Sequence, residues 1–214
     1  LDRSLTGGEM LAQVLKMRRL IGEDIGHVVI MGIGEPFDNY EGLSKFISLI
    51  NSKQGYNLGM RNITVSTCGL VPMIEQFGKD FPQVNLAVSL HAPNDDIRRR
   101  TMPIARRCAY EDLITACRTY TESTKRRITF EYALIDGVND QREHALELAR
   151  HLKGWLTHVN LIPLNEVDGT GYLTSNRETV RSFAGTLDEH GIAVSVRRTL
   201  GTDIDAACGQ LRLR

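Results

Sequence analysis

The sequence predicts an α/β fold in which a parallel sheet, closed or partly closed into a barrel, carries its helices on the outside. Short, nearly continuous apolar runs alternate with longer segments of helical spacing along the whole chain, as repeated strand–helix units do. Polar and glycine-rich residues gather where the predicted strands end, which is where parallel sheets bind ligands. No linker-like stretch or charge block interrupts this alternation, so residues 1–214 are predicted to form one domain.

The first predicted helix begins with a capping box, Thr6-Gly7-Gly8-Glu9. In such a box, the side chains at the two ends satisfy each other's backbone N–H groups. Apolar residues from Met10 to Met17 recur at helical spacing, and Gly22 ends the helix. The run His27-Val28-Val29-Ile30-Met31 follows, and its nearly continuous apolar character predicts a strand that is buried on both faces.

The same alternation predicts five further strands: Asn62–Ser66, Val84–Leu90, Ile128–Leu134, Val159–Pro163 and Ile192–Val196. Apolar residues on one face mark the helices between them: Leu43–Ile50, Leu70–Phe77, Leu113–Tyr120, Ala145–Leu152 and Val180–Leu187. The last of these helices opens with a second capping box, Ser175-Asn176-Arg177-Glu178, and stops at Gly191.

Composition excludes some classes of protein. No apolar run approaches the roughly 20 residues of a membrane-spanning helix, so no membrane segment is predicted. The 26 basic and 26 acidic side chains cancel, so any contact with nucleic acid must come from local basic clusters such as Arg98-Arg99-Arg100. Four scattered cysteines in a chain of this size favour a reducing, cytoplasmic setting.

Five of the predicted strands end in residues suited to a shared ligand pocket. The segments are Gly32-Ile33-Gly34-Glu35-Pro36, Ser66-Thr67-Cys68-Gly69, Ser89-Leu90-His91, Glu131-Tyr132, and Asn160 with Asn165. Gly32 and Gly34 let the backbone approach a ligand, and Glu35 could accept hydrogen bonds from an ammonium or a ribose hydroxyl. His91 is equally well interpreted as a ligand-binding residue or as a hydrogen-bonded core histidine. A dinucleotide fingerprint is disfavoured because no third glycine follows in register.

The segment Asp203-Ile204-Asp205-Ala206-Ala207-Cys208-Gly209-Gln210 contains a thiol with small neighbours. Taken alone, it favours a small buried packing cysteine over a reactive one, because the nearby carboxylates would raise the pKa of the thiol. Cys117 lies on an apolar helical face and is predicted to be part of the core.

Six motifs occur in order: Met31-Gly32-Ile33-Gly34-Glu35-Pro36, Ser66-Thr67-Cys68-Gly69, Ser89-Leu90-His91-Ala92-Pro93, Gly137-Val138-Asn139-Asp140, Asn160-Leu161-Ile162-Pro163-Leu164-Asn165 and Ala207-Cys208-Gly209-Gln210-Leu211. Together they resemble the radical S-adenosylmethionine (SAM) methyltransferases that modify an adenine of 23S ribosomal RNA, the family of RlmN and its antibiotic-resistance relative Cfr. The resemblance covers essentially the whole chain. Its specificity comes from the ordered series, since no single motif would suffice.

The resemblance implies a partial (βα)6 barrel with two cofactors, SAM and a [4Fe-4S] cluster. The residues that it implies for SAM binding are Gly34, Glu35, Ser66, Ser89, Leu90, His91 and Asn165. Cys208 matches the catalytic cysteine that becomes S-methylated, and this match outweighs the packing interpretation. The resemblance further implies 23S rRNA and also tRNA as substrates, flavodoxin or ferredoxin as electron donor, and a monomeric, cytoplasmic protein.

The implied mechanism explains the need for a thiol. A ring carbon of adenine is no nucleophile, so direct transfer from the sulfonium of SAM would fail, whereas a thiolate attacks SAM readily. In the family, a second SAM is cleaved reductively at the cluster, and the resulting radical takes hydrogen from the thioether methyl group. The methyl carbon then adds to adenine. A second cysteine releases the product by forming a disulfide with Cys208.

The family's cluster motif, C-x-x-x-C-x-x-C, lies just upstream of a segment like Arg3-Ser4-Leu5-Thr6, close to where this sequence begins. We therefore expect a barrel without its first strand, one unpaired sheet edge, no metal ligands within the chain, and no reduction of SAM by this polypeptide alone. Three alternatives stay open: methylation at C8 of adenine, which Pro36 slightly disfavours; a non-catalytic SAM- or RNA-binding barrel; and an unrelated phosphate-binding barrel enzyme, which the Cys208 segment disfavours.

Overall fold

The computed structural model describes residues 3–31, 34–164 and 171–197. Six strands form one parallel sheet in chain order: β1 (Val28–Ile30), β2 (Ile63–Thr67), β3 (Asn85–Ser89), β4 (Ile128–Leu134), β5 (Thr157–Pro163) and β6 (Ala193–Val196). Within the described residues β1 and β6 do not pair, so the described sheet does not close into a full barrel. This confirms the predicted α/β class and the partial barrel.

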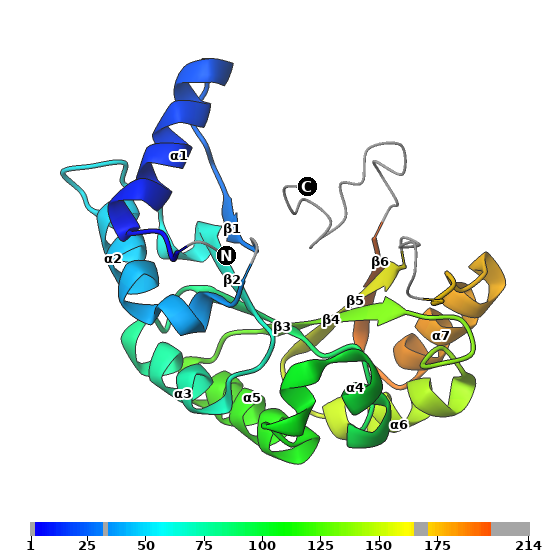
Figure 1. Ribbon diagram of the computed structural model, residues 1–214. Helices are drawn as coiled ribbons and strands as arrows, with labels where there is room; N and C mark the ends of the chain where they lie inside the picture. Colours follow the sequence, from blue (N-terminus) through cyan, green and yellow to red (C-terminus); the bar gives the residue numbers. More distant parts are fainter. Residues whose placement is uncertain (1–2, 32–33, 165–170, 198–214) are drawn as a thin grey trace.

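The helices alternate with the strands: α1 (Gly7–Ile21), α2 (Tyr40–Asn51), α3 (Val71–Asp80), α4 (Asp95–Thr101), α5 (Tyr110–Thr124), α6 (Arg142–Leu152) and α7 (Arg177–Glu189). Three short 3-10 helices complete the described elements: η1 (Pro36–Asn39), η2 (Met60–Asn62) and η3 (Pro103–Arg106). Figure 1 shows the sheet as an arc with helices such as α3, α5 and α6 around its convex side. The concave side of the arc faces away from these helices.

The hydrophobic core fills the space between the sheet and the outer helices. Alternate strand residues point into it, as Ile63 and Val65 of β2 do, and both are fully buried. Phe46 of α2 and Phe77 of α3 pack into the same core. This placement follows from the period-2 geometry of strands and the 3.6-residue period of helices.

The strand residues between these core positions point to the concave face of the sheet. The register aligns four such residues in one row across β3, β4, β5 and β6: Ser89, Glu131, Asn160 and Ser195. Side chains in register on neighbouring strands lie on the same face. The row is polar throughout, and it begins at the C-terminal end of β3 and crosses β4 and β5 at their middle residues.

The first helix forms as the sequence predicted. Thr6 accepts a hydrogen bond from the backbone N–H of Glu9, and the Glu9 carboxylate accepts one from the backbone N–H of Thr6. Gly22 ends the helix in the left-handed conformation, with φ of 73°. The capping box and the terminal glycine are therefore both confirmed.

Local structure differs from the sequence-based expectations in three places. β1 is not buried on both faces, because it pairs only with β2 in the described chain and the Val29 side chain is 55% exposed. The cap of α7 is Asn176 rather than Ser175, since the Asn176 carboxamide accepts from the backbone N–H of Thr179. The segment with the arginine run forms α4, which was not predicted, and Arg98 is fully buried.

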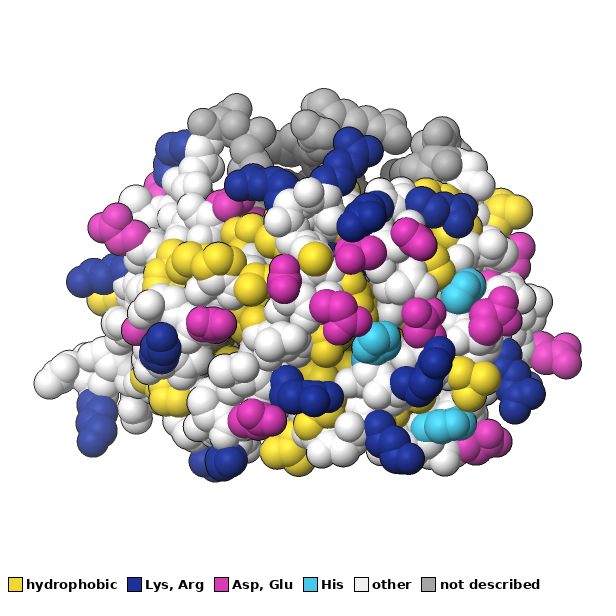
Figure 2. Space-filling model, turned by 90° about the horizontal axis from the view of Figure 1, so that it is seen from below, with side chains coloured by type: hydrophobic (Ala, Val, Ile, Leu, Met, Phe, Trp, Pro, Cys, Tyr) yellow, Lys and Arg dark blue, Asp and Glu magenta, His cyan; other side chains and the backbone are white. Residues whose placement is uncertain are grey.

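Figure 2 shows the outer, helical surface from below. Basic and acidic side chains are interspersed over this face, in keeping with the zero net charge of the chain. None of the helices in the described ranges is both long and apolar enough to cross a membrane.

Candidate functional site

The predicted site residues that the structure describes lie at one edge of the sheet, where the strands end. Gly34 is exposed, with φ of 100°, a conformation that favours glycine. Ser66, Ser89 and His91 are half-buried at the ends of β2 and β3. Leu90 is fully buried, so only its backbone could reach a ligand. Gly32, Asn165 and Cys208, which the sequence also placed in the site, lie outside the described residues.

Glu35 joins the end of β1 to the end of β2. Its Oε1 accepts from the Thr67 hydroxyl at 2.7 Å and from the Phe37 backbone N–H at 3.1 Å. Its Oε2 accepts from the backbone N–H of Cys68 at 2.7 Å. The sequence suggested that a ligand would be the partner of this carboxylate. The structure shows three protein donors there, so the side chain fixes the two loops that flank the edge.

Arg98 extends the same connection to the segment after β3. Its Nη2 donates to the Cys68 carbonyl at 2.7 Å, while Nε and Nη1 are buried and have no partner among the described residues. Burial lowers the pKa of this guanidinium. Gly69, with φ of 99°, leaves room for it, because a Cβ there would lie 3.2 Å from Nη2 and 3.0 Å from the Leu113 side chain.

His91 connects β3 to β4. The residue has φ of 56°, and its Nδ1 accepts from the backbone N–H of Ala133 at 2.9 Å. Burial, together with the charge of Arg98, lowers the pKa of the imidazole to about 4. The ring is therefore neutral at physiological pH, and the Ala133 bond assigns its proton to Nε2. Of the two interpretations of His91, the structure shows the hydrogen-bonded structural role. The second ring nitrogen, Nε2, has no partner in the described part of the chain.

Glu131, Asn160 and Ser195 are joined within the polar row of the concave face. The Ser195 hydroxyl donates to Oδ1 of Asn160 at 3.1 Å, and Nδ2 of Asn160 donates to Oε2 of Glu131 at 2.8 Å. Glu131 is only 7% exposed. Burial raises the pKa of its carboxyl, against opposing effects of the Asn160 bond and the Arg197 charge. The row thus holds β4, β5 and β6 together and retains one carboxylate oxygen, Oε1, with no partner among the described residues.

The cysteines of the described chain do not make a metal centre. Cys68, Cys108 and Cys117 are free thiols, and Cys117 is fully buried in the core, as predicted. Burial raises the pKa of the Cys68 thiol to about 12, and the adjacent Glu35 carboxylate adds to this effect. No three Cys, His, Asp or Glu side chains in residues 3–31, 34–164 and 171–197 come together as metal ligands. These residues therefore do not fit a [4Fe-4S] cluster, which needs thiolate ligands.

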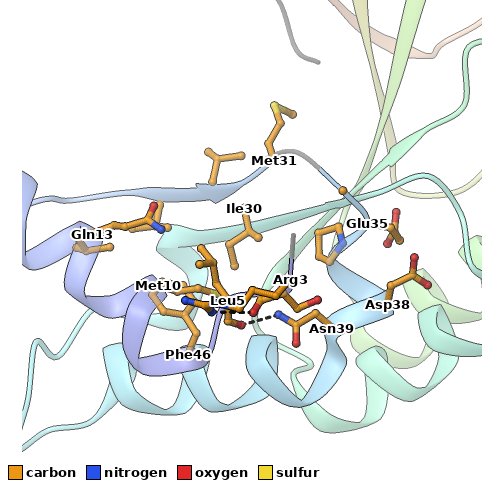
Figure 3. A pocket seen from close by; sticks show the side chains of 16 residues that line it. Arg3, Leu5, Met10, Gln13, Ile30, Met31, Glu35, Asp38, Asn39 and Phe46 are labelled. Carbon is orange, nitrogen blue, oxygen red and sulfur yellow. Dashed lines mark hydrogen bonds between the residues drawn. The ribbon is translucent and has the colours of Figure 1, made fainter. Parts of the chain in front are cut away.

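A pocket of about 540 Å³ lies beside the edge strand β1, between that strand, α1 and η1. In Figure 3, Met10 and Gln13 of α1 line one end of it, while Glu35 and Asp38 lie at the other. Asn39 closes part of its floor by donating from Nδ2 to the Leu5 carbonyl at 2.8 Å.

Arg98 and Asn139 connect the segments at the C-terminal ends of the strands by hydrogen bonds. Sequence reasoning missed both of these residues. Arg98 sits in an arginine run, which the sequence offered as a local basic cluster for nucleic-acid contact. Asn139 was noted only within a turn-like motif, although it is fully buried and bonded to three backbone groups. The available signals were the apolar Ile97 beside Arg98 and the position of Asn139 in the same turn as Gly137, two residues after it.

The sequence of this chain is similar to those of known proteins. Residues 7–149 match the family model of the radical SAM superfamily. A protein of Clostridium tetani described as a probable dual-specificity RNA methyltransferase RlmN is 52% identical over 212 residues, which are 99% of this chain and 61% of that protein. The chain therefore spans about three-fifths of the length of this curated relative.

Solved structures also resemble this chain. The crystal structure of a radical SAM methyltransferase from Sphaerobacter thermophilus matches with a TM-score of 0.93 and 50% identity, over 99% of this chain and 63% of that one. Streptococcus suis SuiB bound to S-adenosylmethionine matches with a TM-score of 0.63 over 92% of this chain and 45% of that one. Its 12% identity supports the shared fold alone.

Proposed function

This chain belongs to the radical SAM superfamily, and from that premise we propose that it forms part of an RNA methyltransferase of the RlmN type. The proposed reaction is methylation of C2 of an adenine in 23S rRNA, and also in tRNA, through an S-methylcysteine at Cys208. The observation that carries the proposal is the 52% identity over 99% of the chain to a protein described as a dual-specificity RNA methyltransferase.

The described residues fit SAM as a ligand of the C-terminal edge. Gly34 exposes its backbone there, and Ser66 and Ser89 bring hydroxyl groups to the concave side. The Nε2 of His91 and the Oε1 of Glu131 are a donor and an acceptor without partners among the described residues. We assign SAM contacts to Gly34, Ser66, Ser89 and His91 and to the backbone of Leu90. Asn165 and Glu35 belong to the same proposed set, and Glu35 also positions the loop that carries Gly34.

In the proposed chemistry, SAM supplies an electrophilic methyl group on its sulfonium. The Cys208 thiol loses its proton to solvent water, and the thiolate sulfur forms a bond to the methyl carbon while the bond from that carbon to the sulfonium breaks. The products are S-methylcysteine and neutral S-adenosylhomocysteine. The later steps need the iron–sulfur cluster, whose ligands the described residues do not supply, so none of them is assigned to a residue here. We also propose flavodoxin or ferredoxin as electron donor, and a monomeric protein acting in the cytoplasm.

The test uses the full-length protein, reconstituted anaerobically with cluster, SAM and a reductant, and an RNA fragment containing the target adenine. We expect methyl transfer with the wild type and none with Cys208→Ala, while Cys117→Ala, which changes a core cysteine, keeps the activity. Mass spectrometry of digested RNA then identifies the product. Undiminished transfer by Cys208→Ala overturns the role of Cys208, and 8-methyladenosine as the product overturns the assignment to C2. A wild type that binds SAM and RNA without transfer supports the non-catalytic alternative.

A further inference from the structure

The backbone at His91 adopts a conformation that histidine seldom takes. Its φ of 56° lies in the left-handed region, which is unfavourable for residues with a Cβ. Such a conformation persists only where surrounding contacts hold it, and it is enriched at ligand-binding sites. The residue directly follows the end of β3, at the edge where the SAM contacts are proposed. The contacts that hold it therefore bear on how its ring is presented.

Asn139 supplies those contacts from the loop between β4 and α6. Its Nδ2 donates to the His91 carbonyl at 2.9 Å and to the Ala133 carbonyl at 2.7 Å. Its Oδ1 accepts from the backbone N–H of Ile135 at 2.8 Å. Both amide hydrogens and the amide oxygen are thus used, and the residue is fully buried. These bonds also fix which end of the carboxamide is nitrogen.

The same contacts fix the imidazole. Asn139 binds the Ala133 carbonyl, and the Ala133 backbone N–H donates to Nδ1 of His91. The backbone N–H groups of Leu90 and His91 both donate to the Glu131 carbonyl, at 3.0 and 3.3 Å. The backbone and one ring nitrogen of His91 are therefore held by β4 and the loop after it. The second ring nitrogen, Nε2, carries the proton and has no partner in the described chain.

We propose that Asn139 is a positioning residue, which holds His91 in the left-handed conformation so that the Nε2–H donates a hydrogen bond to an acceptor atom of bound SAM. The inference rests on the proposed function, because that function supplies the ligand. It adds a residue that acts through another, and it assigns His91 the role of a neutral donor. If His91 acted as a base or as a cation, the protonation of Nδ1 or the charge of the imidazole would have to change.

The test measures SAM binding and histidine ring signals in the full-length protein. We expect Asn139→Ala to weaken SAM binding by about tenfold, the effect of losing one well-placed hydrogen bond. The matched control is Asn85→Ala. The Asn85 amide also joins neighbouring elements, donating to the Arg61 carbonyl and accepting from Arg126. Asn85 lies at the N-terminal end of β3, whereas His91 follows its C-terminal end. We expect the control to lose stability without a matching loss of SAM affinity.

A double-mutant comparison separates positioning from general damage. His91→Gly removes the ring while glycine still accepts a positive φ. If Asn139 acts through His91, adding Asn139→Ala to His91→Gly lowers SAM affinity no further. An additional tenfold loss in the double variant contradicts the proposal.

The ring itself gives a readout that needs no variant to fold. With ¹⁵N-labelled histidine, we expect the His91 signals of the wild type to show an unprotonated Nδ1 and a protonated Nε2 from pH 6 to 8. A protonated Nδ1 or an averaged pattern overturns the proposal. A wild type that does not bind SAM refutes the proposed function instead, whereas SAM binding that is unchanged in Asn139→Ala refutes the positioning role and leaves the function standing.

Discussion

The carboxylate of Glu35 accepts a hydrogen bond from the backbone N–H of Cys68 across 2.7 Å, and this contact ties the segment after β1 to the end of β2. Arg98 binds the carbonyl of the same Cys68 from the other side, also at 2.7 Å. The segment at Cys68 is thus held by an acid from the loop after β1 and by a base from helix α4. The first two expectations test each side of this arrangement.

Replacing Glu35 by Gln puts an NH₂ group where one of two acceptor oxygens was. At least one donor among Thr67, Phe37 and Cys68 then loses its partner. We expect a loss of about 1–3 kcal/mol in the free energy of unfolding, measured by urea denaturation, together with weaker SAM binding. Glu41→Gln on the exposed first turn of α2 is the control, and an equal effect of the two changes would show that the contact is unimportant.

Arg98 and Arg99 are neighbours in sequence with opposite environments. Arg98 is fully buried, whereas the Arg99 side chain is 54% exposed and lies 3.6 Å from Asp95. We expect Arg98→Ala to lower the free energy of unfolding by more than about 2 kcal/mol, because it leaves a cavity and an unpaired Cys68 carbonyl. Arg99→Ala should change it by less than about 0.5 kcal/mol. Arg98→Met, which fills the space without charge, should fall between them.

Glu131 should make the protein less stable as pH rises. Because burial raises the pKa of this carboxyl, the folded state binds its proton more tightly than the unfolded state does. Stability from this group is therefore present below the unfolded pKa of about 4.5 and is lost as pH rises through the folded value. We expect Glu131→Gln to raise the melting temperature by about 2–4 °C at pH 7. The gain should shrink toward pH 5, and SAM binding should weaken.

Thermal melts at pH 5, 6, 7 and 8 check the Glu131 expectation, with Glu122→Gln on the exposed side of α5 as the control. A gain that is the same at every pH would point to packing rather than to charge.

The Cys68 thiol should be slow to react. With its pKa raised to about 12, its thiolate fraction at pH 8 is roughly a thousandfold below that of an ordinary cysteine. We expect iodoacetamide to label Cys68 about that much more slowly than an unstructured peptide thiol, and the rate to rise tenfold per pH unit between pH 7 and 9. Labelling as fast as the peptide would disprove the assigned environment.

The sequence was sufficient for the sheet and most helices, since buried strands and one-sided helices leave patterns of period 2 and 3.6. It was insufficient where a residue's environment comes from distant parts of the chain. Apart from the neighbouring Ile97, the charged run of α4 gives no sign that Arg98 points inward toward the Cys68 carbonyl. Val29 reads as a core residue, but its strand lies at the edge of the described sheet.

The candidate site divides in the same way. The ends of the strands were predictable because parallel strands finish at one edge, and this brought Gly34, Ser66, Ser89 and His91 together. The partners of those residues were not predictable. Glu35 was expected to accept hydrogen bonds from a ligand, and no sequence pattern indicated that three protein donors also bind it. Asn139 lies 48 positions from the carbonyl that it binds, a separation that no local pattern encodes.

The strict chain order of the sheet has a consequence for how the protein is made. Each strand pairs with the one that was synthesised just before it, so a nascent chain can extend the sheet by one strand–helix unit at a time as it leaves the ribosome. No early strand has to wait for a late one to close the described sheet. The most recently made strand always lies at the open edge of the sheet. The hydrogen bonds between polar side chains of neighbouring strands can form as soon as the second strand of each pair has been made.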